Sequence, residues 1–313
     1  MLNRITNAML VNRSLRHIND NAARMHKTQQ QISSGKMINI ASDDPIGATQ
    51  SMSLTGGIKK IDQYRRNIED GVSVMENTSS ILSQIEEILL QIKGVASNAS
   101  SEVTTSAERS AFAFQVDQML RELVQLANSK FQGKFVLGGT ETLSGTKPNS
   151  APFNIQMSGS KIASVIQNPD GLDGEIKRLV GEGKSITINI NGDDVFQPNG
   201  LQGKNDIFDT IIKLRENLFA NDGDSIRVKV NEIDSEFNQV VSQNTLLGAK
   251  VNRLDLVRNQ LDDLKLIQKD QLSSVQDTDI AEAIMRLKTQ EVTFNATLST
   301  SSRILSSSLL DYI

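Results

Sequence analysis

The sequence contains neither cysteine nor tryptophan, and aromatic residues make up only 4% of its 313 residues. Without cysteine there can be no disulfide, no cysteine-ligated zinc and no thiol nucleophile. The apolar share of 38% is also low, against roughly 45–50% in ordinary globular proteins on a count that includes glycine. The chain therefore has little large side-chain area for one thick core, and we expect long helices that each bury a narrow stripe.

Long apolar runs are also missing. No stretch of 18 apolar residues occurs, which argues against a membrane span. The first twenty residues lack the apolar segment of a Sec-type signal. The formal net charge of −4 does not suit a nucleic-acid-binding protein, which needs clustered Lys and Arg. Neither a membrane nor a nucleic acid is therefore an expected partner, and these features alone favour a cytoplasmic location.

A heptad pattern marks the first forty residues. Apolar residues recur there at alternating steps of four and three, which aligns them on one helical face. This seam comprises Val11, Leu15, Ile18, Ala22, Met25 and Ile32, with Gln29 in its one polar slot. Gly35 predicts the end of the helix, because glycine favours the position just after a helix. Asp44 before Pro45 predicts the N-cap and first turn of the next helix.

Heptads continue on both sides of the middle segment. Helices are expected from Pro45 to about 96, with Gly56-Gly57 as a candidate interruption, from about 106 to 130, over 207–218, and from Asp279 onward. The seam between 226 and 261 holds Ile226, Val230, Ile233, Phe237, Val240, Leu247, Val251, Leu254 and Leu261, with polar Asn244 and Arg258 in other slots. The last helix presents Ile280, Ile284, Leu287, Phe294, Leu298 and Leu305.

The middle of the chain has a different pattern. Residues 153–157 and 186–190 alternate with a period of two, which predicts half-buried strands. Asn191-Gly192 predicts a tight turn, with Val195-Phe196 as a returning strand. We therefore expect a mainly α fold with a β-rich insertion, in which long N- and C-terminal heptad helices pack side by side.

Five segments follow from these patterns. They are an N-terminal assembly helix over 1–40, a helical core over 41–138 and 206–275, a β-rich variable domain over 139–205, and a C-terminal assembly helix over 276–313. The first segment is basic, whereas the chain after Asp222 is acidic. Opposite charges favour pairing of the two ends, although each exposed contact contributes only about 0–1 kcal/mol.

Candidates for catalysis or ligand binding are weak. His17 and His26 are nine residues apart, on opposite faces of one helix, so they cannot chelate one metal within it. Residues 181–185 are similar to the end of a phosphate-binding loop, but Arg178 stands where that loop needs its first glycine. The pairs Asp43-Asp44 and Asp193-Asp194 lie in turn-like sequence, where capping is the simpler role. We expect no enzyme activity, no cofactor and no metal.

Several short segments have a familiar order. Residues 32–39 read Ile-Ser-Ser-Gly-Lys-Met-Ile-Asn, and residues 41–48 read Ala-Ser-Asp-Asp-Pro-Ile-Gly-Ala. Residues 133–140, Gly-Lys-Phe-Val-Leu-Gly-Gly-Thr, precede the β-rich segment. Near the other end stand residues 247–254, 277–283 and the closing Ser-Leu-Leu-Asp-Tyr-Ile. Together these segments resemble the bacterial flagellin and hook-associated protein family, and the Asp-Asp-Pro form resembles its hook-associated branch.

The resemblance implies a structural subunit of the flagellum. It implies a ring of copies at the junction between the hook, through hook-associated protein 1, and the flagellin filament. It also implies export through the flagellar type III channel, a chaperone on the C-terminal helix, and a secreted protein in an extracellular or periplasmic flagellum. Packing between subunits is then expected from Val11, Leu15, Ile18, Met25, Leu298, Leu305, Leu309 and Leu310.

Two other interpretations stay open at this point. A divergent flagellin would form the filament itself and would polymerise alone. A cytoplasmic coiled-coil adaptor would form a stable soluble oligomer with ordered ends and would not be exported.

Overall fold

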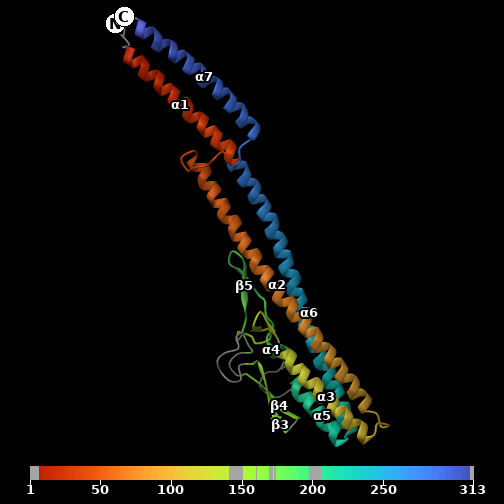
Figure 1. The fold of residues 1–313 in the computed structure, drawn as a ribbon. Coiled ribbons are helices and arrows are strands. Elements are labelled where there is room, and N and C mark those ends of the chain that lie inside the picture. Colours follow the sequence, from red (N-terminus) through yellow and green to blue (C-terminus); the bar gives the residue numbers. More distant parts are fainter. Residues whose placement is uncertain are drawn as a thin grey trace. The chain divides into compact units, whose positions relative to one another are not determined.

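The protein folds as long helices with short β-hairpins between them (Figure 1). The computed structural model describes residues 7–140, 151–159, 161–168, 172, 174–196 and 206–310. Two compact units are present, one of Met1–Lys60 with Asp263–Ile313 (unit 1) and one of Ile61–Asp262 (unit 2). The expected fold class, mainly α with a β-rich insertion, is confirmed. The five segments expected from the sequence concern assembly and stay a prediction.

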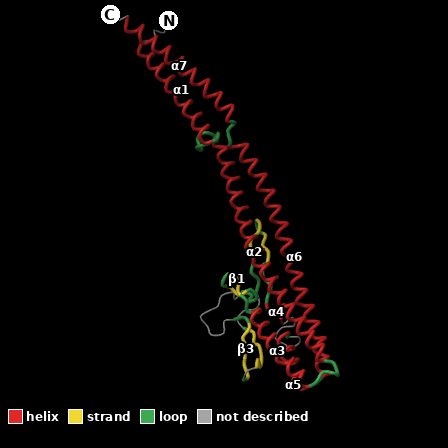
Figure 2. The backbone as a smooth tube through the Cα atoms, turned by 45° about the vertical axis from the view of Figure 1, so that its right-hand side comes forward, coloured by secondary structure: helices red, strands yellow, loops and turns green. Residues whose placement is uncertain are grey.

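Unit 1 contains two long helices from opposite ends of the chain. Helix α1 (Asn7–Ser34) and helix α7 (Ile280–Leu310) lie side by side and antiparallel (Figures 1 and 2). The unit also holds the first part of α2 (Pro45–Ala99) and the last part of α6 (Gly223–Gln276). None of the described helices is long and apolar enough to cross a membrane.

The predicted helix ends in unit 1 are confirmed. Gly35 follows α1 with φ +69°, a left-handed conformation that glycine adopts easily. The carboxylate of Asp44 accepts the Ile46 N–H at 3.1 Å, and α2 begins at Pro45. Asp279 caps α7 in the same way, with its Oδ1 atom 2.8 Å from the backbone nitrogen of Ala281. Each cap satisfies an N–H group that the helix itself leaves unpaired.

The interruption considered at Gly56-Gly57 was wrong, since α2 runs unbroken to Ala99. A Cβ atom at Gly57 would lie 2.7 Å from Oε1 of Gln268 on α6. Glycine therefore lets α2 and α6 approach closely at this point, and it does not break the helix.

Unit 2 has a helical core formed by α2, α3 (Ser106–Ala127), α5 (Ile207–Ala220) and α6. The predicted α6 seam is confirmed at its heptad positions, which are Ile226, Ile233, Val240, Leu247, Leu254 and Leu261, all buried. The polar seam residue Asn244 is also satisfied. Its amide accepts from the Ser79 hydroxyl at 2.7 Å and donates to Glu86 at 2.9 Å. Such a polar pair helps to fix the register of α2 against α6.

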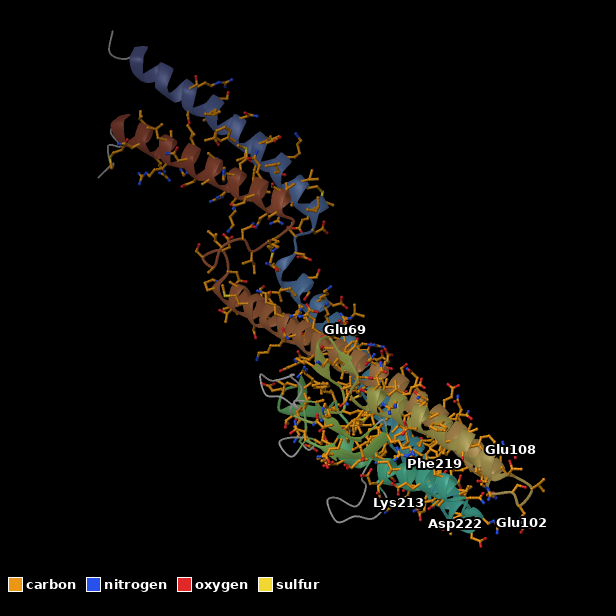
Figure 3. All side chains as sticks on the ribbon, turned by 60° about the horizontal axis from the view of Figure 1, so that its bottom comes forward. Glu69, Glu102, Glu108, Lys213, Phe219 and Asp222 are labelled. Atoms are coloured by element: carbon orange, nitrogen blue, oxygen red, sulfur yellow. The ribbon has the colours of Figure 1, made fainter. Side chains whose placement is uncertain are left out.

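Two connecting segments, the link between α2 and α3 and the link between α5 and α6, lie together at one end of unit 2. Figure 3 shows Glu108 and Asp222 at this end. The buried guanidinium of Arg109 ties the links together, since it donates to the Ala99 carbonyl at 2.9 Å and to the Asn221 side chain at 2.7 Å. The links are therefore fixed to the helices that they connect.

The β-rich part consists of three described antiparallel hairpins. They are β1 (Lys130–Phe131) with β2 (Lys134–Phe135), β3 (Phe153–Ser158) with β4 (Lys161–Gln167), and β5 (Lys177–Gly181) with β6 (Lys184–Thr187). The strand predicted over 153–157 is confirmed as β3. The segment similar to a phosphate-binding loop is the β5–β6 turn, where Gly183 has φ +67°.

The hairpin predicted around Asn191-Gly192 was wrong. Strand β6 ends at Thr187, and Gly192–Phe196 form the short helix α4. Two acidic residues in its first turn favour a helix start. Phe196 is fully buried and stacks on Phe208 of α5, with ring centroids 4.9 Å apart. Tertiary packing of this aromatic ring therefore overrides the local turn signal.

Candidate assembly surface

The contact between α1 and α7 combines small side chains with larger apolar ones, among them the half-buried Leu287 and Phe294 of α7. On α1, Thr28 is buried and Asn21 is half-buried, and the Asn21 amide donates to the Thr297 hydroxyl at 3.1 Å. On α7, Ala283 and Ser301 are buried. A groove of about 450 Å³ runs along this contact, lined by Ser14, His17, Asn21, Thr293, Ala296, Thr297, Thr300 and Ser301. The two helices thus pack through polar contacts between small residues as well as through half-buried apolar side chains.

The predicted α1 seam is confirmed except at Leu15 and Gln29. Leu15 is 50% exposed and Gln29 is exposed, whereas the other seam residues are half-buried, namely Val11, Ile18, Ala22, Met25 and Ile32. Ser14, Asn21 and Thr28 take the intervening inward positions. A heptad alternates steps of three and four residues, and the first step from Val11 can be either. The set with Ser14, Asn21 and Thr28 therefore fits a heptad as well as the predicted set with Leu15, Ala22 and Gln29. The prediction was wrong at Leu15, where Ser14 instead lines the groove with Thr300 and Ser301 of α7, and at Gln29, where Thr28 is buried.

Leu15 and two α7 residues form an exposed apolar flank. Ile284 is 47% exposed and Leu298 is 41% exposed. Each of the three follows directly after an inward-facing residue, so each is turned by about 100° away from the contact. In an antiparallel pair, equal rotations in the chain direction turn both flanks to the same side. Leu15, Ile284 and Leu298, which we call the apolar flank, therefore share one side of the α1–α7 pair.

The other predicted packing residues divide differently. Val11, Ile18 and Met25 contribute to the contact within the chain. The side chains of Leu305, Leu309 and Leu310 lie outside the described residues. The role of all eight residues in packing between subunits stays a prediction.

Charge does not hold α1 against α7 at three of the six basic residues of the N-terminal segment. Arg13, Arg16 and Arg24 are exposed, and none has an acidic partner among the described side chains. Lys27 pairs instead with Asp43, in the link after α1. These three arginines therefore do not supply the expected attraction between a basic and an acidic helix.

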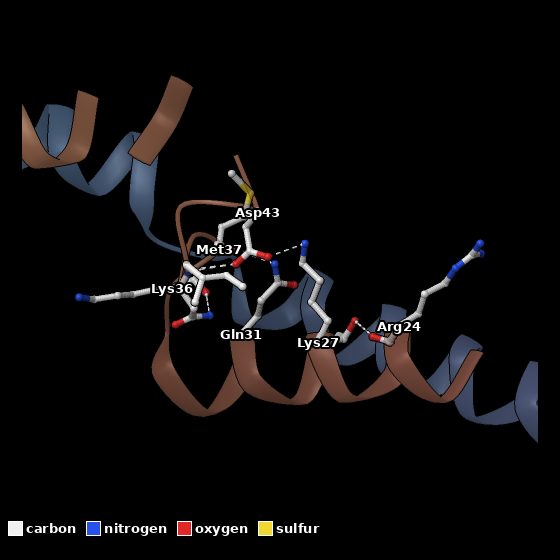
Figure 4. A network of polar contacts seen from close by, with 9 residues as sticks. Arg24, Lys27, Gln31, Lys36, Met37 and Asp43 are labelled. Atoms are coloured by element: carbon white, nitrogen blue, oxygen red, sulfur yellow. Dashed lines mark hydrogen bonds and ion pairs between the residues drawn. The ribbon is translucent and has the colours of Figure 1, made fainter. Parts of the chain in front are cut away.

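The link after α1 is held by a polar network (Figure 4). Lys27 Nζ lies 2.8 Å from Asp43 Oδ1, and Asp43 Oδ2 accepts the Asn39 and Ile40 N–H groups at 3.2 Å each. Gln31 donates its amide to the Met37 carbonyl at 2.8 Å. The hydrogen bond from Lys27, followed by the two backbone N–H groups, lowers the pKa of Asp43.

This link also pairs with the connection between α6 and α7. The Met37 N–H donates to the Gln276 carbonyl at 2.7 Å, and the Thr278 N–H donates to the Gly35 carbonyl at 3.0 Å. The residues of the Ser-Ser-Gly-Lys and Asp-Asp-Pro segments thus fasten the base of the α1–α7 pair. Their role here is structural, and the Asp43-Asp44 pair forms a turn and a cap.

The other candidates for chemistry are dispersed. His17 lines the groove between α1 and α7, while His26 is exposed elsewhere on α1. Asp193 and Asp194 begin α4. Across the described ranges, no three His, Asp or Glu side chains are placed to hold one metal ion. Sequence analysis missed Glu236, which is buried in unit 2, because it stands beside the seam residue Phe237 with no motif around it.

Comparison with known proteins agrees with this architecture. The sequence matches the models for the bacterial flagellin N-terminal helical region over residues 5–142 and the C-terminal helical region over residues 230–313. It is 23% identical to flagellar hook-associated protein 3 of Escherichia coli over 309 residues, 94% of this chain and 95% of that protein. It is 27% identical to a flagellin of Clostridium tyrobutyricum over 165 residues, 52% of this chain and 44% of that protein.

A solved structure shows the same fold. Flagellar hook-associated protein 3 of Legionella pneumophila aligns with a TM-score of 0.62 at 15% identity, over 72% of this chain and 98% of that chain.

Proposed function

Because the chain belongs to the bacterial flagellin family, we propose that it is a structural subunit of the flagellum and that it forms the junction between hook and filament. The end-to-end similarity to hook-associated protein 3 of E. coli is the observation that carries this proposal. The similarity spans both helical arms and the β-rich part between them. The role needs no catalytic group, and it makes the arms the functional parts of the molecule.

The apolar flank supports an assembly role for α1 and α7. Leu15 and Leu298 expose about half of their side chains to water in the single chain, and burying a leucine fully is worth about 1.5–3 kcal/mol. Packing against neighbouring copies supplies that burial. Contacts of this heterologous kind generate a tube or ring when repeated around an axis.

The proposed position at the junction implies the partners of the chain. Copies of this chain form a ring, with hook-associated protein 1 on the hook side and flagellin on the filament side. The chain reaches that place by flagellar export, with a chaperone on its C-terminal helix until then. The mature location is the flagellum, outside the cell or in a periplasm.

Deletion of the gene tests the proposal. Electron microscopy of the cells, combined with an assay for flagellin in the medium, should show hooks without filaments and unpolymerised flagellin shed outside. Re-expression of the wild-type chain from a plasmid should restore filaments. Normal filaments in the deletion strain would overturn the junction role.

The same experiment separates a second candidate, the filament subunit itself. The match to the Clostridium flagellin favours this alternative over about half of the chain. It predicts bare hooks with no flagellin in the medium. It also predicts that the purified chain polymerises alone into long filaments.

A further inference from the structure

Glu236 is a carboxyl group in the helical core of unit 2. It lies on α6 between the fully buried seam residues Ile233 and Val240, and only 3% of its surface is exposed. Both of its carboxyl oxygens are shielded from water, and neither forms an ion pair with a described side chain. Burying a charge without a partner costs free energy, so an unpaired carboxylate is unusual in a core.

The charged groups around Glu236 do not compensate for its burial. Glu232, one turn earlier on α6, and Asp206, the N-cap of α5, both carry negative charge and oppose ionisation of Glu236. Lys229 favours the charged form, but its ammonium group already pairs with Glu232 at 2.5 Å. Among the described side chains, the hydroxyl of the buried Thr210 on α5 is the one polar group that favours the charged form by a hydrogen bond, and its effect is smaller than that of burial. An ionised Glu236 therefore lowers the stability of the folded chain, and only the neutral form avoids this cost.

Asp117 shows that unit 2 can accommodate a buried acid with a partner. Its side chain is 9% exposed, and its Oδ1 atom lies 2.5 Å from Nη1 of the equally buried Arg215. Of these two buried acids, only Glu236 lacks an ionic partner among the described side chains.

Protonation removes the cost at Glu236. Burial, with smaller contributions from the nearby acids, raises the pKa of Glu236 from 4.5 to about 7. The folded chain then holds this proton more tightly than the unfolded chain does. By linkage, this group lowers stability as pH rises from about 4.5 to 7, and its full effect is present above that window.

We propose that Glu236 is a built-in destabilising group that keeps unit 2 easy to unfold at neutral pH, so that the chain can pass unfolded through an export channel. The inference rests on the proposed function, because a subunit that must cross a channel has a use for a labile core. Its placement fits this use, since α6 packs along α2 and its buried seam runs from Ile226 to Leu261, nearly the whole part of the helix in this unit.

The test is denaturant unfolding of the full purified chain, with Glu236→Gln, Glu236→Met and, as a control, Glu216→Gln at an exposed position on α5. Near pH 8, the Glu236 variants should fold with an equilibrium constant up to about 300-fold larger than the wild type, which corresponds to the shift from 4.5 to about 7. The gain should shrink markedly near pH 4.5, and the control should match the wild type at both values. Equal stability of the variants and the wild type near pH 8 would overturn the proposal.

Two further measurements test the proposal, the pH dependence of wild-type stability and the rate of export. If the variants do not fold, the wild-type chain must itself lose stability between about pH 5 and 7 by the linkage argument, and a flat or rising curve would overturn the proposal. In cells, the stabilised Glu236→Met chain should be exported several-fold more slowly than the wild type. Unchanged export of a stabilised chain would overturn the export role. The deletion phenotype would remain as an independent test of the junction role.

Discussion

Arg215 on α5 donates to the Asp117 carboxylate on α3 at 2.5 Å, in the core of unit 2. Arg121 of α3 holds the other oxygen of the same carboxylate at 3.1 Å. Aspartate and its two arginines thus fix how α5 packs on α3. A buried pair of this kind is costly to break, although replacing it entirely by apolar side chains is often neutral.

Arg215→Met should therefore destabilise unit 2 by about 3 kcal/mol, because Asp117 keeps only the half-exposed Arg121 as a partner. Denaturant unfolding of the full chain measures the free energy of unfolding. The double variant Asp117→Leu with Arg215→Met removes both charges and should recover much of the loss. A single variant as stable as the wild type would show that water already screens the pair.

Two glycines of α2 in unit 1 should respond in opposite directions to alanine. A Cβ atom at Gly47 would lie 2.5 Å from Asp44 Oδ2 and 2.6 Å from Ile38 Cδ1, so Gly47→Ala must displace the cap and the buried isoleucine. At Gly56 nothing lies within 4 Å, so Gly56→Ala should stabilise the helix by up to about 1 kcal/mol. Thermal unfolding followed by circular dichroism compares them. A stable Gly47→Ala chain would mean that the link can shift without cost.

Acid should loosen the link after α1. The Lys27 ammonium and two backbone N–H groups hold the pKa of Asp43 below its ordinary value of 3.8. The folded state therefore binds this proton more weakly than the unfolded state. The contribution of Asp43 is present above its ordinary pKa and is lost as pH falls through the lowered value.

A carboxyl NMR titration of the full chain checks this sign. The pKa of Asp43 should be lower than in a short peptide of the same sequence, and Lys27→Met should raise it. Lys36→Met provides the matched control, because the Lys36 side chain is exposed and makes no ion pair with Asp43. An Asp43 pKa that is the same in the chain and in the peptide would show that the network does not persist in solution.

Sequence periodicity predicted the helices well because their cores are repetitive. The α6 seam from Ile226 to Leu261 is buried at every seventh residue, as a heptad requires. Asp44 and Gly35 mark helix ends through local capping, which depends on neighbouring residues alone. Such features are readable from the sequence because the cause lies within a few residues of the effect.

The remaining features depend on contacts between distant segments. Arg215 and Asp117 are 98 residues apart, so no spacing connects them. The local signal at Asn191-Gly192 predicted a turn, yet Phe196 is drawn into an aromatic cluster with Phe153 and Phe208. The inward face of α1 was misjudged at Leu15 for the same reason, since Ser14 lines a groove with Thr300 and Ser301 of the distant helix α7.

The apolar flank leads to the most direct test of assembly. Leu15 and Leu298 are about half exposed in the single chain, so Leu15→Asp and Leu298→Asp should change its stability by no more than about 0.5 kcal/mol, as surface changes usually do. Ile18 is half-buried within the α1–α7 pair, and Ile18→Asp should instead separate α1 from α7.

If the apolar flank packs between subunits, both leucine variants should be exported normally but fail to enter the flagellum. A chain with Leu15 and Leu309 both replaced by Asp should behave in the same way. Cells expressing each variant in the deletion strain would then carry hooks without filaments, with the variant chain in the medium. Filaments of normal length with Leu15→Asp and Leu298→Asp would place the subunit contact elsewhere on α1 and α7.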